Sequence, residues 1–264
     1  MIPMRLVSFN VQSGRANQSW GGAVLGDDAM NDAAVREAAA EIAQLKPDVL
    51  ALQEVREDRG RSILSAFAES AGMEHRRFAA CRRAPSNFIA RMFRRSRRGY
   101  GIAFATTYPI DYIRALRLPS WRNPMRRASD RRLGWRFRLE EQRMAIVAVL
   151  LTPKPVVVGA THLTTKQPDN RKQLRRLEDF MARVARRRGI PDAPRIVLGD
   201  LNTRLEDIQK QTEYEVLAQA LTYPDDEPSS QIDHILGVGF RAAGEATTRR
   251  LAVSDHRMLA VDVD

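Results

Sequence analysis

The stretch Ile196–Thr203 joins an apolar run to side chains that could do chemistry. It opens with Ile-Val-Leu, typical of a buried strand, and closes with polar residues that include Asp200 and Asn202. Because side chains two apart on an extended segment point the same way, both are predicted to face one cleft at the strand end. The carboxylate could take or orient a proton of water, and the amide could hold an oxygen. A strand followed by an ordinary Asp/Asn turn would look the same, so this stretch needs support from elsewhere.

Polar residues also stand at or near the ends of other predicted strands. Asn10 lies near the end of the alternating segment 5–11, and His162 follows the apolar run 156–161. Glu54 interrupts the apolar run 49–55. An unpaired carboxylate in a buried strand is costly, so Glu54 is expected to have a partner or a metal ion.

Two further polar groups lie near the C-terminus. Asp233 stands in Ile-Asp-His, and Asp255 precedes His256 in Ser-Asp-His. A carboxylate that accepts a hydrogen bond from one imidazole nitrogen fixes the charge or tautomer of the ring, so Asp233 is expected to hold His256. His234 is expected to pack beside the site, because its side chain should point away from that of its neighbour.

The remaining pattern predicts an α/β fold in one domain over residues 1–264, with a cleft along one edge of its sheets. Strands outnumber helices, and the chain shows no repeat and no convincing linker. Apolar spacing and cap residues predict helices that begin at Asn31 or Asp32, at Ser62 and at Asp169 or Asn170, and a further helix around Tyr214–Leu221. Arg143 and Arg171 are interpreted as structural residues.

The net charge of +11 is concentrated in one region. Residues 76–138 contain 18 Arg, no Lys and two acids, a charge of 18 − 2 = +16, which leaves 11 − 16 = −5 for the rest. Such an Arg-rich segment attracts phosphate-bearing partners such as nucleic acid or anionic lipid. The alternative is a set of solvated loops in a proteome that favours Arg over Lys.

The longest apolar run, Met144–Leu151, is too short to cross a bilayer, and the chain starts in a strand-like pattern instead of a signal peptide. A soluble cytoplasmic protein is therefore expected. The single Cys81 cannot form an internal disulfide.

Taken in order, the polar motifs resemble those of the endonuclease/exonuclease/phosphatase superfamily. That superfamily includes deoxyribonucleases, apurinic endonucleases, sphingomyelinases, inositol polyphosphate phosphatases and deadenylases. The resemblance runs from residue 10 to residue 256, and implies a four-layer α-β-β-α sandwich of two mixed β-sheets flanked by helices. The residues that carry it are Asn10, Glu54, His162, Asp200, Asn202, Asp233, Asp255 and His256.

These residue types suit phosphoester hydrolysis, which needs a hard cation, a positioned water and donors to the phosphoryl oxygens. Asn10, Glu54 and Asp255 offer oxygen ligands for magnesium (Mg²⁺) or manganese (Mn²⁺), whereas zinc would favour Cys and His. Asp200 and Asn202 are expected to orient the attacking water, with Asp200 as the base.

Both histidines are expected to be catalytic. His162 is expected to donate to a phosphoryl oxygen or the leaving group, and His256 to act with Asp233. Histidine at the position of His162 resembles the deoxyribonuclease, sphingomyelinase and phosphatase branches, since apurinic endonucleases usually have tyrosine there. Gln12 stands where some branches have a carboxylate, which leaves a second metal ligand there in question.

Three functions stay open from the sequence. A metal-dependent nuclease is favoured, with nucleic acid bound by the Arg-rich segment. The alternative is a phosphatase or phosphodiesterase on a small phosphorylated molecule or lipid head group, with arginines as phosphate clamps. The third is a nucleic-acid or membrane-binding module with an inactive site. The sequence leaves the oligomeric state open.

Overall fold

The computed structural model describes residues 3–17, 31–58, 61–83, 99–119 and 142–264. The sequence around Trp121 and Pro124 predicts an exposed loop or hairpin, and Trp135–Leu139 alternates like a strand, but both segments lie outside the described residues.

The described residues form two mixed β-sheets. The first sheet contains β1 (Met4–Asn10), β2 (Val49–Asp58), β3 (Arg61–Ser62), β4 (His75–Arg83), β5 (Gly99–Thr106), β12 (Thr247–Arg249) and β13 (Met258–Val263). Its order is β12-β13-β1-β2-β5-β4, with β3 paired to β2. Only β1 and β2 are parallel in this sheet as described.

The second sheet contains β6 (Ile110–Arg117), β7 (Met144–Leu150), β8 (Val156–His162), β9 (Arg195–Asp200), β10 (Glu215–Val216) and β11 (Asp233–Val238). Its order is β10-β11-β9-β8-β7-β6. The pair β8 and β9 is parallel, and the other described pairs are antiparallel.

Three of the four described helices begin at or within one residue of their predicted starts, and the short fourth is not predicted by the sequence. The helices are α1 (Asp32–Gln44), α2 (Ile63–Ser70), α4 (Asp169–Arg187) and the short α5 (Leu205–Ile208), and a 3₁₀ turn, η1, spans Gln12–Gly14. The Asn31 side chain accepts hydrogen bonds from two backbone amides at the start of α1, and Ser62 Oγ accepts one at the start of α2. Each of these two helices therefore begins where a side chain satisfies its first amides.

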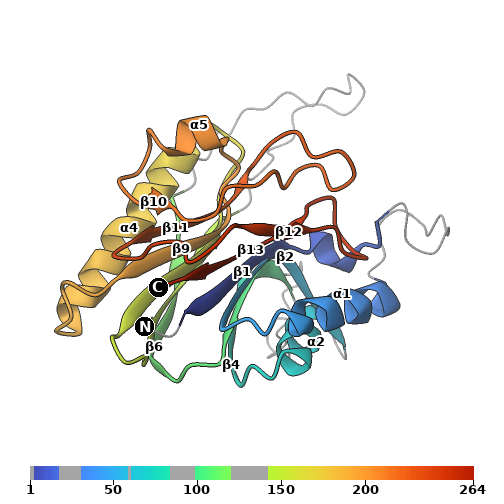
Figure 1. Ribbon diagram of the computed structural model, residues 1–264, viewed down its shortest axis with the longest axis horizontal. Helices are drawn as coiled ribbons and strands as arrows, with labels where there is room; N and C mark the ends of the chain where they lie inside the picture. The colour runs from blue at the N-terminus through green and yellow to red at the C-terminus, as the bar shows by residue number, and fades with distance from the viewer. Residues whose placement is uncertain (1–2, 18–30, 59–60, 84–98, 120–141) are drawn as a thin grey trace, which may run out of the picture.

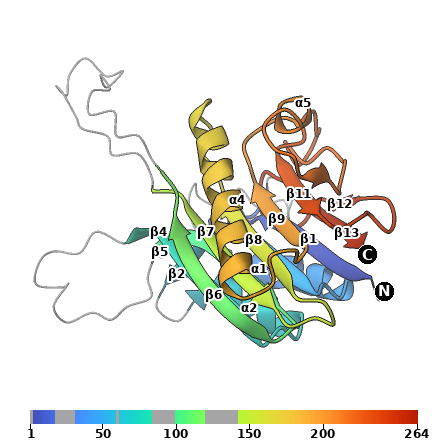
Figure 2. The same ribbon diagram turned by 90° about the vertical axis from the view of Figure 1, so that its left-hand side faces the viewer.

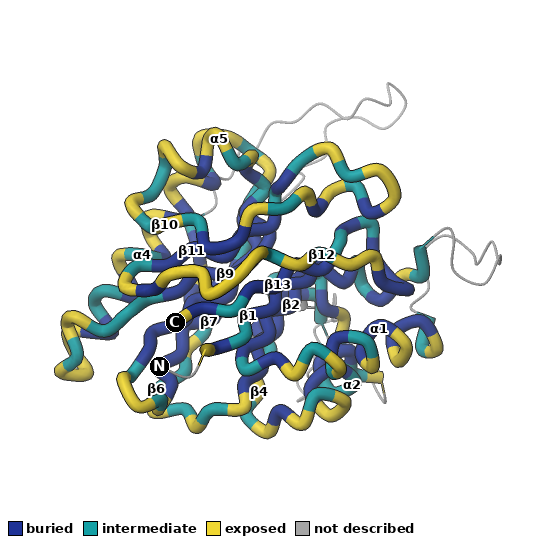
Figure 3. Tube along the Cα trace, viewed as in Figure 1, coloured by how far each residue is buried: buried dark blue, intermediate teal, exposed yellow. Residues whose placement is uncertain are grey.

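Three apolar clusters separate four layers. One lies between the two sheets, one between the first sheet and α1 and α2, and one between the second sheet and α4. Figures 1 and 2 show the helices on the outer faces of the stacked sheets, and Figure 3 shows the buried residues along the strands. In β7, Ile146 faces the other sheet and Val147 faces α4. Because both faces are covered, this strand is a continuous apolar run.

The helix predicted at Tyr214–Leu221 is wrong. Val216 pairs with Leu236 in the sheet, and the Leu217 amide donates to the Ile235 carbonyl at 2.9 Å. Pairing at the sheet edge satisfies backbone groups that an isolated helix of this length could not stably satisfy.

In the described part of the chain, no helix has the length and apolar character needed to cross a membrane.

Candidate active site

Strand direction brings the candidate side chains to one end of the sandwich. The parallel strands β1 and β2 carry Asn10 and Glu54, and the parallel strands β8 and β9 end in His162 and Asp200. β11 runs against β9 and begins at Asp233, directly opposite Asp200. A hydrogen bond of 3.1 Å from Asn10 Nδ2 to Asp200 Oδ2 joins the two sheets at this end.

Gly199 allows β8 and β9 to approach each other beside the site. Its φ is +151°, and a Cβ atom there would lie 1.9 Å from the carbonyl oxygen of Thr161. Only glycine fits this close approach. The tight pairing sets His162 beside Asp200 in the strand register.

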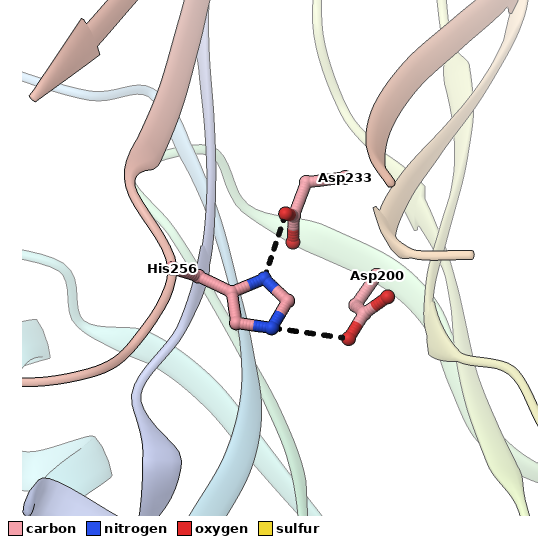
Figure 4. A group of neighbouring side chains, drawn as sticks. All are labelled: Asp200, Asp233 and His256. Atoms are coloured by element: carbon pink, nitrogen blue, oxygen red, sulfur yellow. Dashed lines mark hydrogen bonds and ion pairs between the residues drawn. The ribbon is translucent and has the colours of Figure 1, made fainter. Parts of the chain in front are cut away.

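Asp233, His256 and Asp200 lie in a line, with a hydrogen bond on one side of the ring and an ion pair on the other (Figure 4). His256 Nδ1 lies 2.8 Å from Asp233 Oδ2, and His256 Nε2 lies 3.9 Å from Asp200 Oδ2. All three side chains are buried. The ring is therefore oriented by one carboxylate and directed at the other.

Asp200 is the group on which the other side chains converge. Besides Asn10, His162 Nε2 lies 3.3 Å from Asp200 Oδ2. The backbone N–H of Asn202 donates to Asp200 Oδ1 at 3.0 Å. Both carboxylate oxygens are thus held in fixed directions.

Burial and charge set different protonation states for these groups. Burial by itself lowers the pKa of His256, but the charge and hydrogen bond of Asp233, with Asp200 and Asp255, raise it to about 10. Burial, and then the charge of Asp233, raise the pKa of Asp200 to about 7 against the opposing effect of His256. His256 is therefore a cation at neutral pH, and Asp200 can exchange a proton there.

His162 has the opposite character. Burial, followed by the positive charges of Arg143 and His256, places the pKa of His162 well below 6.5. It is a neutral ring at ordinary pH and can donate one N–H.

Glu54 sits in a β-bulge at the end of the sandwich that carries Asp200. The register of β2 against β5 shifts between Leu52 and Val55, and Glu54 has a φ of 55°. Left-handed backbone in a residue with a side chain is rare and concentrates at functional sites. The bulge breaks the inward and outward alternation that an unbroken strand would impose on Glu54.

The Glu54 carboxylate has both hydrogen-bond partners and a like charge nearby. Burial raises its pKa, hydrogen bonds from Tyr100 and Asn10 lower it, and the charge of Asp255 raises it. Two carboxylates and an amide therefore meet at one place, which is a donor set for a hard cation.

Two groups of side chains could hold a cation. The ligand atoms of Asp200, Asp233 and His256 lie within 4.8 Å of one another. In that group, however, the protonated ring already supplies positive charge to both carboxylates. His256 Nε2 also lies 4.0 Å from Asp255 Oδ1, and its charge lowers the pKa of Glu54, but burial and Asp255 leave that pKa raised. A protonated ring cannot itself bind a metal ion, so the oxygen donors Asn10, Glu54 and Asp255 fit a cation better.

Asn202 does not continue the alternation of β9, and the prediction that it points the same way as Asp200 for that reason is wrong. β9 ends at Asp200, and Asn202 has a left-handed φ of 48°. Its Nδ2 donates to the Leu163 carbonyl at 3.0 Å, while its backbone amide donates to Asp200. The side chain still lies at the site, but it is directed there by a turn.

His234 is buried beside the site, with Nε2 2.7 Å from the carbonyl oxygen of Thr203. Arg143, interpreted from the sequence as structural, lies near enough to His162 for its charge to act on that ring. Its Nη1 is buried and has no hydrogen-bond partner among the described residues, and its charge lowers the pKa of His162.

Sequence reasoning did not select three other residues at the site. Tyr223 is 37 % exposed, and its ring centroid lies 4.9 Å from that of His256. Tyr100 bonds Glu54. Ser254 Oγ donates to the Asn10 carbonyl at 2.5 Å and accepts from the His256 amide at 3.0 Å. Only Ser254 had a signal in the sequence, because it belongs to the Ser-Asp-His motif.

The fold and these motifs define a phosphoesterase-type α/β sandwich. The family model "Endonuclease/Exonuclease/phosphatase family" matches residues 7–256, and the chain belongs to this family. Members of the family are hydrolases of phosphoester bonds. A sequence search of curated proteins gave no match.

Solved structures share the fold at low sequence identity. The endonuclease/exonuclease/phosphatase protein of Beutenbergia cavernae superposes with a TM-score of 0.66 at 19 % identity, over 99 % of this chain and 71 % of that chain. Truncated TDP2 of Caenorhabditis elegans gives 0.59 at 14 % identity, over 99 % and 97 % of the two chains. ANGEL2, described as a 2′,3′-cyclic phosphatase, gives 0.61 at 16 % identity, over 99 % and 95 %.

Proposed function

We propose that this chain, as one domain over residues 1–264, is a divalent-metal-dependent hydrolase of phosphodiester bonds that acts on nucleic acid. The observation that carries the proposal is the convergence of Asn10, His162 and His256 on the Asp200 carboxylate. Phosphate esters resist hydrolysis because their charge repels a nucleophile, so an enzyme must supply both an activated water and positive donors. The convergent groups offer both.

In this proposal Asn10, Glu54 and Asp255 are the ligands of Mg²⁺ or Mn²⁺, since all three offer oxygen. A cation bound there would neutralise charge on the phosphoryl oxygens. Its presence would also offset the burial of Glu54 and the repulsion from Asp255, which raise the pKa of Glu54 in the bare protein.

Asp200 is the proposed base. Its pKa of about 7 lets it accept a proton from water at neutral pH, and its hydrogen bonds from Asn10 and the Asn202 amide fix the direction of that transfer. The Asn202 side chain would help to orient the water.

The two histidines would stabilise the phosphoryl group. His256, kept protonated by Asp233, would donate to a phosphoryl oxygen. His162, neutral and buried, would donate its N–H to a phosphoryl oxygen or to the oxygen of the leaving group.

The nucleic-acid substrate is favoured by the charge of +16 carried by residues 76–138. The second candidate is a phosphatase or phosphodiesterase acting on a small phosphorylated molecule or an anionic lipid head group. The fold shared with ANGEL2, named as a 2′,3′-cyclic phosphatase, keeps that candidate open.

The test is hydrolysis of plasmid DNA, single-stranded DNA, RNA and bis(4-nitrophenyl) phosphate, with Mg²⁺ or with EDTA. Wild-type protein should cleave nucleic acid only with the metal ion, and an Asp200→Asn variant purified in parallel should not cleave it. Cleavage that survives in the variant would identify a contaminating nuclease. Hydrolysis restricted to the small phosphoester would transfer the assignment to the second candidate, and hydrolysis in EDTA would contradict the metal requirement.

A further inference from the structure

The outward side of α4 is a row of arginines. We call Arg171, Arg175, Arg176, Arg183, Arg186 and Arg187 the α4 basic face. All are exposed except Arg183, which is half-buried. The opposite side of the helix packs into the apolar cluster under the second sheet (Figure 2).

The α4 basic face has one exposed acidic residue among its arginines, Asp179, one turn from Arg175 and Arg183, and the charge of Arg175 also acts on the half-buried Glu178. Within the described ranges, the ion pairs of α4 and its C-cap are Lys172 with Asp169 and Arg188 with Asp111. None of the six arginines forms an ion pair with a residue that the structure describes.

This arrangement costs the helix stability. Arg171 and Arg175, and Arg183 and Arg187, are like charges four residues apart, each pair destabilising by about 0.2 to 0.5 kcal/mol, and the single Asp179 between Arg175 and Arg183 offsets only part of this repulsion. Arg171 also lies in the first turn, where the helix dipole disfavours positive charge. By contrast, Arg186 and Arg187 in the last turn are favoured by the dipole and need no other explanation. The informative residues are therefore those of the first four turns.

That part of α4 begins at the site. Asn170 Nδ2 donates to Thr203 Oγ1 at 2.8 Å, and Gln173 Oε1 accepts from the Thr164 amide at 2.9 Å, two residues after His162. From Arg171 to Arg183 the helix rises about 18 Å, at about 1.5 Å per residue. The basic face thus extends from the rim of the site along the flank of the molecule.

The chemistry of the surface favours the phosphates of a nucleic acid over a membrane. A helix that lies in a bilayer surface inserts large apolar side chains. Among the described residues, the exposed large apolar side chains are Leu151, Leu221 and Tyr223, none of them on α4. Guanidinium groups bind phosphate oxygens in bidentate fashion, which suits a backbone with repeated phosphates.

We propose that the α4 basic face binds the phosphate backbone of a nucleic acid outside the catalytic centre. The inference rests on the proposed function, because the strand held there is the substrate whose scissile phosphate enters the site beside Asp200.

The test compares two triple variants of equal charge. Arg175→Gln, Arg176→Gln and Arg183→Gln remove the centre of the basic face. Arg36→Gln, Lys154→Gln and Arg241→Gln remove three exposed basic side chains from α1, the turn between β7 and β8, and the segment after β11, all outside residues 76–138. Neither set includes a residue of the site.

Binding of a fluorescent 30-nucleotide single strand is measured in EDTA over a range of salt concentrations. We expect the α4 variant to bind at least about tenfold more weakly at low salt, and its slope of log affinity against log salt to fall by about 2, since each phosphate bound contributes about 0.7. The control variant should bind like the wild type. Both variants should hydrolyse bis(4-nitrophenyl) phosphate at the wild-type rate.

Equally weakened binding in both variants, or wild-type binding by the α4 variant, would overturn the inference. If the α4 variant binds nucleic acid normally but no longer binds the phosphatidylserine vesicles that the wild type binds, the inference is overturned in favour of a membrane surface. If the wild type binds nucleic acid through α4 but cleaves none, the binding surface stands and the proposed nuclease function fails.

Discussion

Glu54 is the residue on which the proposed metal site depends most. It brings a negative charge into a half-buried position, where burial and then the charge of Asp255 raise its pKa against hydrogen bonds from Tyr100 and Asn10 and the charge of His256. Glu54→Gln deletes the charge at nearly constant volume. We therefore expect most Mg²⁺ binding and activity to be lost while the fold remains.

Calorimetric titration of Mg²⁺, activity at limiting Mg²⁺ and circular dichroism check this prediction. Glu206→Gln, at an exposed position on α5, is the matched control. Wild-type activity of Glu54→Gln at limiting metal would remove Glu54 as the principal ligand.

Two of the histidines lie at the site, and a third, His75, lies away from it and serves as a control. His162 and His256 lie against Asp200, whereas His75 pairs with Thr106 at the start of β4, at the opposite end of the sheet from Glu54. His162→Ala and His256→Ala should each lower kcat by about 10² or more, the scale for losing a proton-transfer or oxyanion-stabilising group. His75→Ala should be near neutral. Steady-state kinetics on the best substrate check it, and an equal loss in His75→Ala would contradict the site.

For single residues, the sequence predicts which side chains belong to the site better than it predicts how each side chain is directed. The motifs select Asp200, Asp233 and His256, which the structure brings together. Asn202 was assigned by strand alternation, which fails because the strand stops two residues earlier. Tyr223 could not be found at all, since its position against His256 depends on a loop whose path no local pattern encodes.

Among the elements, those with caps and covered faces could be predicted. Asn31 and Ser62 mark the starts of α1 and α2, and β7 is apolar throughout because both of its faces are covered. The edge strands were missed. β4 and β6 carry exposed arginines and face solvent along part of their length, so their sequences lack the apolar signal of a strand.

The approach of β8 to β9 depends on Gly199. Gly199→Ala would put a Cβ atom 1.9 Å from the Thr161 carbonyl oxygen at a φ of +151°. The strands must then separate, and we expect a loss of about 3 kcal/mol or more in the free energy of unfolding. Gly244→Ala, with nothing within 4 Å of its added Cβ, should change it by less than about 1 kcal/mol. Urea unfolding measures both, and equal midpoints would contradict the close approach.

Glu178 on α4 gives the fold a dependence on pH. It accepts a hydrogen bond from Thr212 Oγ1, and burial raises its pKa to about 7 from 4.5. Because the folded state holds the proton more tightly than the unfolded chain, this contribution to stability is full below about pH 4.5 and is lost as pH rises through 7. Glu178→Gln should remove that dependence, which is worth on the order of 1 to 3 kcal/mol.

Urea unfolding at intervals from pH 4.5 to pH 8 compares Glu178→Gln with the wild type and with Glu206→Gln, an exposed control on α5. The wild type and the control should lose stability across this range more steeply than Glu178→Gln. Parallel curves for all three proteins would show that Glu178 titrates as it does in the unfolded chain.

For the whole molecule, charge separates the chain into a basic region and the remainder. Residues 76–138 carry +16 and the remaining residues −5, so long-range attraction of a polyanion depends on that region and on locally unbalanced surfaces such as the α4 basic face. Two such concentrations of positive charge are more than a small substrate needs, since one or two guanidinium groups suffice to hold a single phosphate.

Arg94, Arg95, Arg97 and Arg98 lie outside the described residues, so the prediction for them rests on charge alone. If they bind a nucleic-acid backbone, changing all four to Gln should weaken binding of every sequence alike, because phosphates carry no sequence information. Each phosphate that is no longer neutralised should lower the salt slope by about 0.7 to 0.9. Fluorescence anisotropy on several DNA and RNA sequences measures the slope. An unchanged slope, with normal hydrolysis of a small phosphoester, would favour a small-substrate phosphatase, in which these arginines are merely solvated.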